Sequence, residues 1–376
     1  MDSFTVHVPS LAGFGLDLQD LGTCFSSNAS HTLSAVSLPS GSVGLLASLT
    51  SSFEDFQATL AASHQQDLTA LSSLRTGLAA AEREYLATDN ASAQAMSTLS
   101  ANATGDATVS GPSDDGGGVS RFSGLQLPTL PAVEDDRFTV RRVVDAGIEL
   151  ITPFDEPLGR VIGVKPAADY LTPLAADWET LQTLGSRIRQ LGINDFVTSE
   201  NVSGGVRWLQ SGWSGNAAQE FAASADGLGQ AISTRSADLD AVSKIVANGG
   251  ACLERLVYNQ AMDLSSGLTR PMSFLGFTLP LGIWAQLIDR PMRDSIKTEI
   301  VSGVDALKSS ADVRRDAVTN MIGKISQALD YTPGRVTPPF DAGEYEVPDK
   351  VIVDFSAAKY GFGDNVWWEN SNASTF

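Results

Sequence analysis

Cysteine and histidine are scarce in this chain of 376 residues, which holds only Cys24 and Cys252 and His7, His31 and His64. Two cysteines so far apart in sequence make neither a disulfide framework nor a zinc site, and whether they pair is left open. No histidine has a second histidine or a cysteine at the spacing of a metal-binding motif. We therefore expect no metal site and no cofactor.

Basic residues are also few. The chain has 25 lysines and arginines against 44 acidic residues, a net charge of -19. This deficit argues against nucleic acid as a partner, because too few cations are present to neutralise a run of phosphates. It also argues against electrostatic attachment of the chain to anionic lipid.

Aromatic residues make up only 7% of the sequence, whereas hydrophobic residues make up 43% and are mostly alanine, leucine and valine. Alanine and leucine are good helix formers. The composition therefore predicts an all-α fold of long antiparallel helical hairpins or a bundle, followed by an irregular C-terminal tail.

Two further features are missing. The N-terminal residues MDSFTVHVPSLAGFG lack the positive region and apolar run of a Sec signal peptide. Residues 159–165 (GRVIGVK) lack the spacing of a phosphate-binding loop, and residues 212–216 (GWSGN) lack the final glycine of a nucleophile elbow. We therefore expect a protein that is not an enzyme.

Apolar residues at helical spacing indicate where the helices lie. They predict helices over residues 11–25, 51–90, 140–150, 167–196, 216–264 and 291–329. Between them, residues 101–125 are rich in Gly, Ser, Asp and Thr, which is typical of a flexible linker. The expected organisation is an N-terminal hairpin (1–100), this linker, a second helical domain (126–330) and an acidic, aromatic tail (331–376).

The stretch WLQSGWSGN, residues 208–216, interrupts two long helical patterns and predicts the corner of a helical hairpin. Gly212 and Gly215 supply the backbone freedom that a sharp reversal needs. Trp208 and Trp213 would close the end of the hairpin with their rings. The alternative is a tryptophan that precedes a glycine by two positions without structural meaning.

A second motif is Tyr-x-x-x-Asp at Tyr85 and Asp89, where the phenol and the carboxylate share one face of a helix. We expect this pair near the C-terminal end of the helix over residues 51–90, with a minor role in folding. The same pattern recurs at residues 345–349 and 360–364, where Pro348 and two glycines disfavour a helix.

Together these motifs resemble those of actinobacterial proteins secreted by type VII (ESX) systems. The Trp-x-Gly corner is similar to that of the small helical-hairpin substrates, and Tyr-x-x-x-Asp is similar to their general export signal. The order of motifs resembles fused PE/PPE-like substrates and the N-terminal region of channel and necrotising-toxin proteins. One departure is that no recognisable enzyme domain follows residue 330, which puts a toxin activity in doubt.

The resemblance implies a secreted or envelope-associated interaction protein that is exported without a Sec signal. It implies the secretion ATPase or a chaperone as a partner, and a small helical-hairpin partner or self-association besides. The alternative is a membrane-active, channel-like component or a trafficking module of a toxin system.

That alternative depends on the uncharged apolar block over residues 272–288, which is marginal in length for a bilayer-spanning helix and is cut by glycine and proline. We favour a buried hairpin or helix cap there, so a membrane is an open but less favoured partner. The candidate membrane-active residues are Phe274, Leu275, Phe277, Leu279, Leu281 and Trp284.

Overall fold

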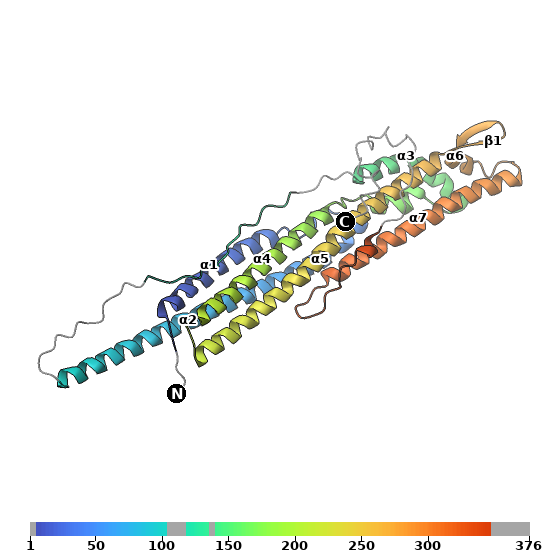
Figure 1. Cartoon of the computed structure of the whole chain (residues 1–376). Coiled ribbons are helices and arrows are strands. Elements are labelled where there is room, and N and C mark those ends of the chain that lie inside the picture. The colour runs from blue at the N-terminus through green and yellow to red at the C-terminus, as the bar shows by residue number, and fades with distance from the viewer. Residues whose placement is uncertain (1–4, 104–117, 135–139, 347–376) are drawn as a thin grey trace. The chain divides into compact units, whose positions relative to one another are not determined.

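The computed structural model describes residues 5–103, 118–134 and 140–346. It is 77% helical with antiparallel packing, which confirms the all-α prediction. The α-helices are α1 (Val8–Leu33), α2 (Thr50–Ala103), α3 (Val140–Ile162), α4 (Thr180–Gln210), α5 (Asn216–Thr269), α6 (Leu281–Gln286) and α7 (Asp294–Leu329) (Figure 1). The strands β1 (Pro271–Phe274) and β2 (Phe277–Pro280) pair as an antiparallel hairpin.

Contacts divide the chain into two compact units, each assembled from three separate stretches. Unit 1 comprises residues 1–34, 59–131 and 190–240; unit 2 comprises residues 35–58, 132–189 and 241–376. Helices α2, α4 and α5 each contribute to both units. Unit 1 thus combines α1 and most of α2 with the parts of α4 and α5 that flank the corner.

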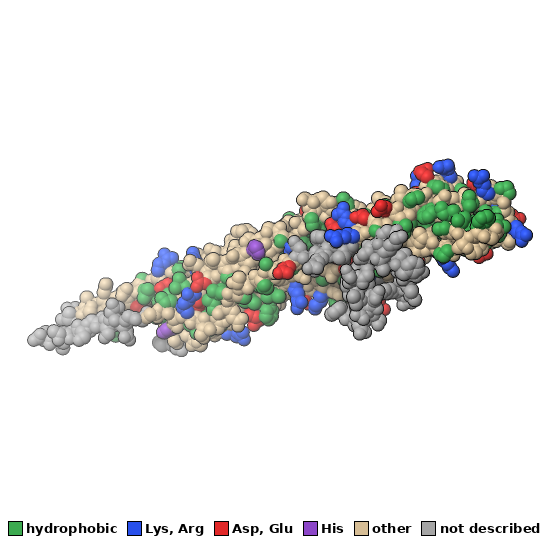
Figure 2. All heavy atoms as spheres, turned by 90° about the horizontal axis from the view of Figure 1, so that it is seen from above, with side chains coloured by type: hydrophobic (Ala, Val, Ile, Leu, Met, Phe, Trp, Pro, Cys, Tyr) green, Lys and Arg blue, Asp and Glu red, His purple; other side chains and the backbone are tan. Residues whose placement is uncertain are grey.

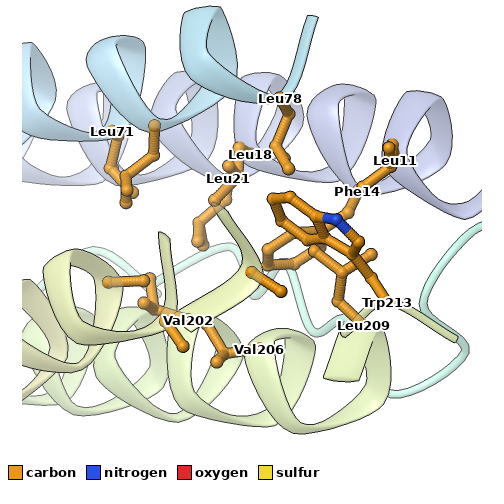
Figure 3. Close-up of a cluster of buried hydrophobic side chains, with 14 of the residues drawn as sticks. Leu11, Phe14, Leu18, Leu21, Leu71, Leu78, Val202, Val206, Leu209 and Trp213 are labelled. Atoms are coloured by element: carbon orange, nitrogen blue, oxygen red, sulfur yellow. The ribbon is translucent and has the colours of Figure 1, made fainter. Parts of the chain in front are cut away.

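The core of unit 1 is an apolar cluster between α1, α2, α4 and α5 (Figure 3). The buried stripe of α1 repeats every three or four residues, and Pro9 lies in its first turn, where a missing backbone N–H costs nothing. Gly205 on α4 allows the close approach of Phe14, because a Cβ at that position would lie 2.0 Å from the ring carbon Cε2. The stripe of α1 is Leu11, Phe14, Leu18, Leu21 and Phe25.

Part of the expected flexible linker, residues 118–125, is instead packed against α1. Asp17 is 1% exposed and accepts hydrogen bonds from Arg121 Nε at 2.6 Å and from the backbone N–H of Phe122 at 2.8 Å. The carboxylate on α1 thus holds the segment in place, which composition alone does not reveal. Residues 104–117, the greater part of that linker, lie outside the described residues.

A buried network of charged side chains links three helices of unit 1. Arg235 on α5 donates from Nε to Asp195 on α4 at 2.7 Å and from Nη2 to Asp67 on α2 at 2.5 Å. His64, also on α2, lies with Nε2 3.2 Å from the other Asp195 oxygen. All four residues are at most 7% exposed. A buried charge that loses its partner is strongly destabilising, so the network constrains which helical registers can form.

We predict that Asp195→Ala lowers the free energy of unfolding by about 3–5 kcal/mol, because it leaves the Arg235 guanidinium buried with one carboxylate in place of two. Urea denaturation followed by circular dichroism measures the loss. Asp226→Ala removes an exposed carboxylate from α5 and serves as the control. Equal midpoints for the two variants would contradict the prediction.

The network also predicts a pH dependence. Burial raises the pKa of the Asp67 carboxyl, and Arg235 opposes this rise only in part. A raised pKa in the folded state means that protonation of Asp67 stabilises the fold. That stabilisation is complete below the unfolded pKa of about 3.9 and is lost as the pH rises through the folded pKa. Asp67→Asn is the reference, because its side chain is neutral at both pH values. We expect the Tm of the unmodified chain minus that of Asp67→Asn to be larger at about pH 4 than at about pH 7. Calorimetry at both pH values measures this difference, and an equal difference at the two would contradict it.

In unit 2, α4 and α5 approach each other closely at small residues. A Cβ on Gly185 would lie 2.7 Å from Ala247 Cβ, and one on Gly250 would lie 2.7 Å from Leu181 Cβ. Of the expected tail, residues 331–346 are described and belong to unit 2. There Tyr331 packs edge-on against Phe56 at 6.1 Å between ring centroids. The rest of the tail, from residue 347 on, lies outside the described residues.

Several helix boundaries differ from those expected. Helix α3 continues to Ile162 through two interior prolines, because Phe154 and Leu158 are buried and hold it in place. The segment expected to begin a helix at residue 167 forms short π and 3-10 turns, and α4 begins only at Thr180. Helix α2 extends thirteen residues beyond the expected end at residue 90, to Ala103.

The apolar block over residues 272–288 is divided between two kinds of structure. Its first part forms most of the β1–β2 hairpin and its second part contains α6, so a hairpin is present as expected, but its tip is exposed and not buried. Leu281 and Trp284 are each 3% exposed, Phe274 and Leu279 are half-buried, and the remaining two candidates, Leu275 and Phe277, are exposed. Across residues 5–103, 118–134 and 140–346, no helix combines the length and apolar character needed to cross a membrane.

Candidate recognition site at the helical corner

The corner between α4 and α5 lies in unit 1, in the stretch predicted from the sequence. Helix α4 ends at Gln210 and α5 begins at Asn216. Gly215, immediately before α5, has a φ of 103°, a left-handed conformation that glycine adopts without steric cost. The glycine of Trp-x-Gly is therefore required by the backbone, and any other residue there would be strained.

The N-terminal segment pairs with this corner, a feature that the sequence did not predict. Val6 and Trp213 form an antiparallel β-bridge. His7 donates its backbone N–H to the Gly212 carbonyl at 2.8 Å, and Ser214 donates to the Thr5 carbonyl at 2.9 Å. These two hydrogen bonds satisfy the Gly212 carbonyl and the Ser214 N–H of the corner. The sequence could not predict this pairing, because residues 5–7 are too short a run to show the alternation that marks a strand.

The two tryptophans have different surroundings. Trp213 is 4% exposed, and Figure 3 shows its ring within the cluster formed by α1, α2 and α4. Its ring centroid lies 5.6 Å from that of Phe221 on α5. Trp208 is half-buried at the margin of the cluster, 6.3 Å from Phe14 and 6.1 Å from Phe122 between centroids. Only Trp213 is a core residue.

Tyr85 lies beside the corner. The indole Nε1–H of Trp213 donates to the Tyr85 hydroxyl over 3.3 Å, which joins residues 128 apart in sequence. Tyr85 is half-buried against the apolar cluster, a contact that its expected place at a helix end did not predict. The expected position near a helix end is wrong, since α2 continues to Ala103. Asp89 is exposed one turn further along α2.

A groove of about 550 Å³ between α2 and α5 begins at Trp213. Small side chains form most of its lining, so the two helices leave room between them without a deep cavity. Glu220 supplies a carboxylate at its rim. The lining residues are Ala70, Ser73, Leu74, Gly77, Ala81, Trp213, Ala217, Glu220, Phe221, Ser224 and Leu228.

The other candidate residues lie elsewhere. The apolar block belongs to unit 2. Tyr345 lies in a 3-10 turn (Ala342–Tyr345), and its motif partner Asp349 and the whole of the 360–364 match lie outside the described residues. Burial raises the pKa of the Cys252 thiol to about 11. In the described part of the chain, no three His, Cys, Asp or Glu side chains come together as a metal site.

Comparison with protein-family models, with curated proteins and with solved structures finds no match to this chain. A functional argument for this protein therefore has to come from its own residues. Among the described residues, the arrangement around Trp213 is the place where two sequence motifs, far apart in the chain, come into contact.

We predict that Trp213→Ala lowers the free energy of unfolding by about 3–5 kcal/mol, because it removes a large ring from the unit 1 core. Thermal and urea denaturation measure the change. Phe196→Ala removes a ring that is 54% exposed and is the matched control. A melting curve for Trp213→Ala that overlays that of the control would contradict the assignment of Trp213 to the core.

Proposed function

We propose that this protein is a non-enzymatic substrate of a type VII secretion system and acts after export as a secreted or envelope-associated interaction protein. Its export signal is a composite surface that comprises Tyr85 and Asp89 on α2 and the Trp213-x-Gly215 corner beside them. The single observation that carries the proposal is the contact between the Trp213 indole and the Tyr85 hydroxyl.

That contact supports a composite signal for a physical reason. Residues from two motifs, presented together by one folded unit, form a surface that exists only when unit 1 has folded. A receptor that reads both motifs would thus distinguish the folded substrate from an unfolded chain. The Tyr85–Trp213 hydrogen bond fixes the position of the phenol ring, so less side-chain freedom remains to be lost on binding.

The exposure of α2 beyond Tyr85 also supports the proposal. Every side chain from Leu86 to Thr98 is exposed, so Asp89 is accessible on the helix surface. In unit 1, the groove beside Trp213 could receive an amphipathic helix, a common mode of peptide recognition. A secretion ATPase or chaperone could therefore contact the carboxylate and the groove together. A small helical-hairpin protein or a second copy of the chain is the other partner proposed for this surface.

We predict that Asp89→Ala and Tyr85→Ala each remove most of the protein from the culture filtrate while it remains in the cell. The test expresses each variant in a host with an intact type VII system and blots the cell and filtrate fractions. Asp89→Ala is the sharper of the two variants, because its exposed side chain contributes little to folding. For Tyr85→Ala, circular dichroism of the purified protein establishes that the chain is folded.

Glu84→Ala is the matched control, since it removes an exposed carboxylate next to Tyr85 on α2, on a different face from Asp89. Tyr345→Ala tests the competing motif in unit 2. Both controls should be exported normally. Normal export of Asp89→Ala and of folded Tyr85→Ala would refute the signal and remove the main support for the proposed function.

A further inference from the structure

The β1–β2 hairpin in unit 2 (Figure 1) carries two large apolar residues whose side chains are exposed to solvent. Leu275 is 56% exposed and Phe277 is 66% exposed. The hairpin is held along β1, where Trp284 Nε1–H donates to the Met272 carbonyl at 2.8 Å and the Trp284 ring meets Phe274 edge-on at 5.3 Å. A two-stranded hairpin is marginal on its own, so this anchor is what keeps the tip in a fixed position.

Both the backbone conformation and the exposure of Leu275 are unfavourable for a leucine. With Gly276 it forms a two-residue turn in which both φ angles are positive, 54° and 82°. Such turns favour Asn-Gly or Asp-Gly, because a bulky L-residue is strained in the left-handed region. A polar residue would also suit the exposed position better. A bulky apolar residue kept where conformation and solvation both disfavour it points to a functional contact.

The charge around the hairpin is opposite to that of the chain as a whole. Residues 270–294 contain three arginines, Arg270, Arg290 and Arg293, against two acidic residues, Asp289 and Asp294, and so carry a net positive charge in a chain of net charge -19. All three arginines are exposed, and within the described residues none forms an ion pair. Charges more than about 10 Å away are largely screened near 0.1 M salt, so the local arginines decide what this surface attracts.

Figure 2 shows the same surface. Hydrophobic side chains gather in the part of the molecule where Figure 1 labels β1, and both basic and acidic side chains lie at the margin of this patch. An apolar tip with exposed arginines in the flanking sequence suits the interface of a bilayer with anionic headgroups. There the apolar groups enter the acyl boundary and the cations stay with the phosphates.

We propose that the β1–β2 hairpin docks this protein on a membrane surface that contains anionic phospholipid, with Leu275 and Phe277 inserted at the interface and Arg290 and Arg293 on the headgroups. A protein partner fits less well for two reasons. Two exposed side chains are far from the roughly 800 Å² per partner that a stable interface buries. The paired prolines Pro271 and Pro280 also limit the addition of a further strand at the hairpin edges.

The test is flotation of the purified full chain with vesicles of phosphatidylcholine alone and of an equal mixture of phosphatidylcholine and phosphatidylglycerol. We expect the chain to float with the anionic vesicles and not with the neutral ones. Leu275→Asn with Phe277→Thr should weaken the binding roughly tenfold or more, through the loss of buried apolar surface. Arg290→Gln and Arg293→Gln should each weaken it roughly fivefold.

The Tm of the tip variants, Leu275→Asn and Phe277→Thr, shows whether a loss of binding comes from unfolding. Asparagine suits the left-handed turn position better than leucine, so Leu275→Asn should keep or raise the Tm while it loses membrane binding. Phe196→Thr, which removes an exposed ring from unit 1, should float like the unmodified chain. Arg189→Gln, at an exposed arginine on α4, is the matched control for charge.

Three results would overturn the proposal. The first is no flotation of the unmodified chain with anionic vesicles, including the case in which light scattering finds tip-dependent self-association instead. The second is flotation that the tip variants leave unchanged. The third is equal flotation with neutral and anionic vesicles, which would remove the role of Arg290 and Arg293. None of these results depends on the export signal, because the purified chain is used.

Discussion

The indole ring of Trp213 lies where four parts of unit 1 meet: the α4–α5 corner, α1, α2 and the N-terminal residues 5–7. The ring fills the apolar cluster, its backbone bridges to Val6, and its N–H reaches the Tyr85 hydroxyl. Gly215 lets the chain turn directly after it. Removing the ring would therefore open the core and loosen the corner together, and the surface formed by Tyr85 and Asp89 depends on both.

A second constraint lies further along the same helices. Apolar packing by itself tolerates small shifts of one helix along another, whereas Arg235 meets Asp67 and Asp195 only in one register of α2, α4 and α5. A buried ion network adds little net stability, because desolvation offsets most of the attraction. In unit 1 the network instead favours one register of the helices, because any other register would leave a charge buried without a partner.

In the hairpin of unit 2 the notable residue is exposed and strained, whereas in unit 1 the notable residues are buried and satisfied. Its base obeys the usual rules, with Trp284 buried and its N–H satisfied, while its tip keeps Leu275 in a strained and exposed position. Sites of this kind are where local preferences and function diverge. The corner in unit 1 and the hairpin in unit 2 thus support separate proposals, one for export and one for attachment.

The sequence by itself determined the helical class, the position of the corner and the burial of Trp213. Each of these depends on local information: helical periodicity, the conformational freedom of Gly215, and the size of one apolar ring. It did not determine that α2 runs to Ala103, because alanine-rich sequence without an apolar stripe is compatible with helix or linker alike. Nor did it determine that the hairpin expected over residues 272–288 is made of strands, since a short apolar run fits a strand and a buried helix equally.

Tertiary structure alone decided the contacts between distant positions. Tyr85 and Trp213 are 128 residues apart, and Asp67 and Arg235 are 168 apart. No periodicity connects such pairs, because a pattern along one helix states which face is apolar and not which residue of another helix it meets. That meeting depends on the lengths of the intervening helices and on the close approaches that residues such as Gly205 permit, and both are properties of the folded chain.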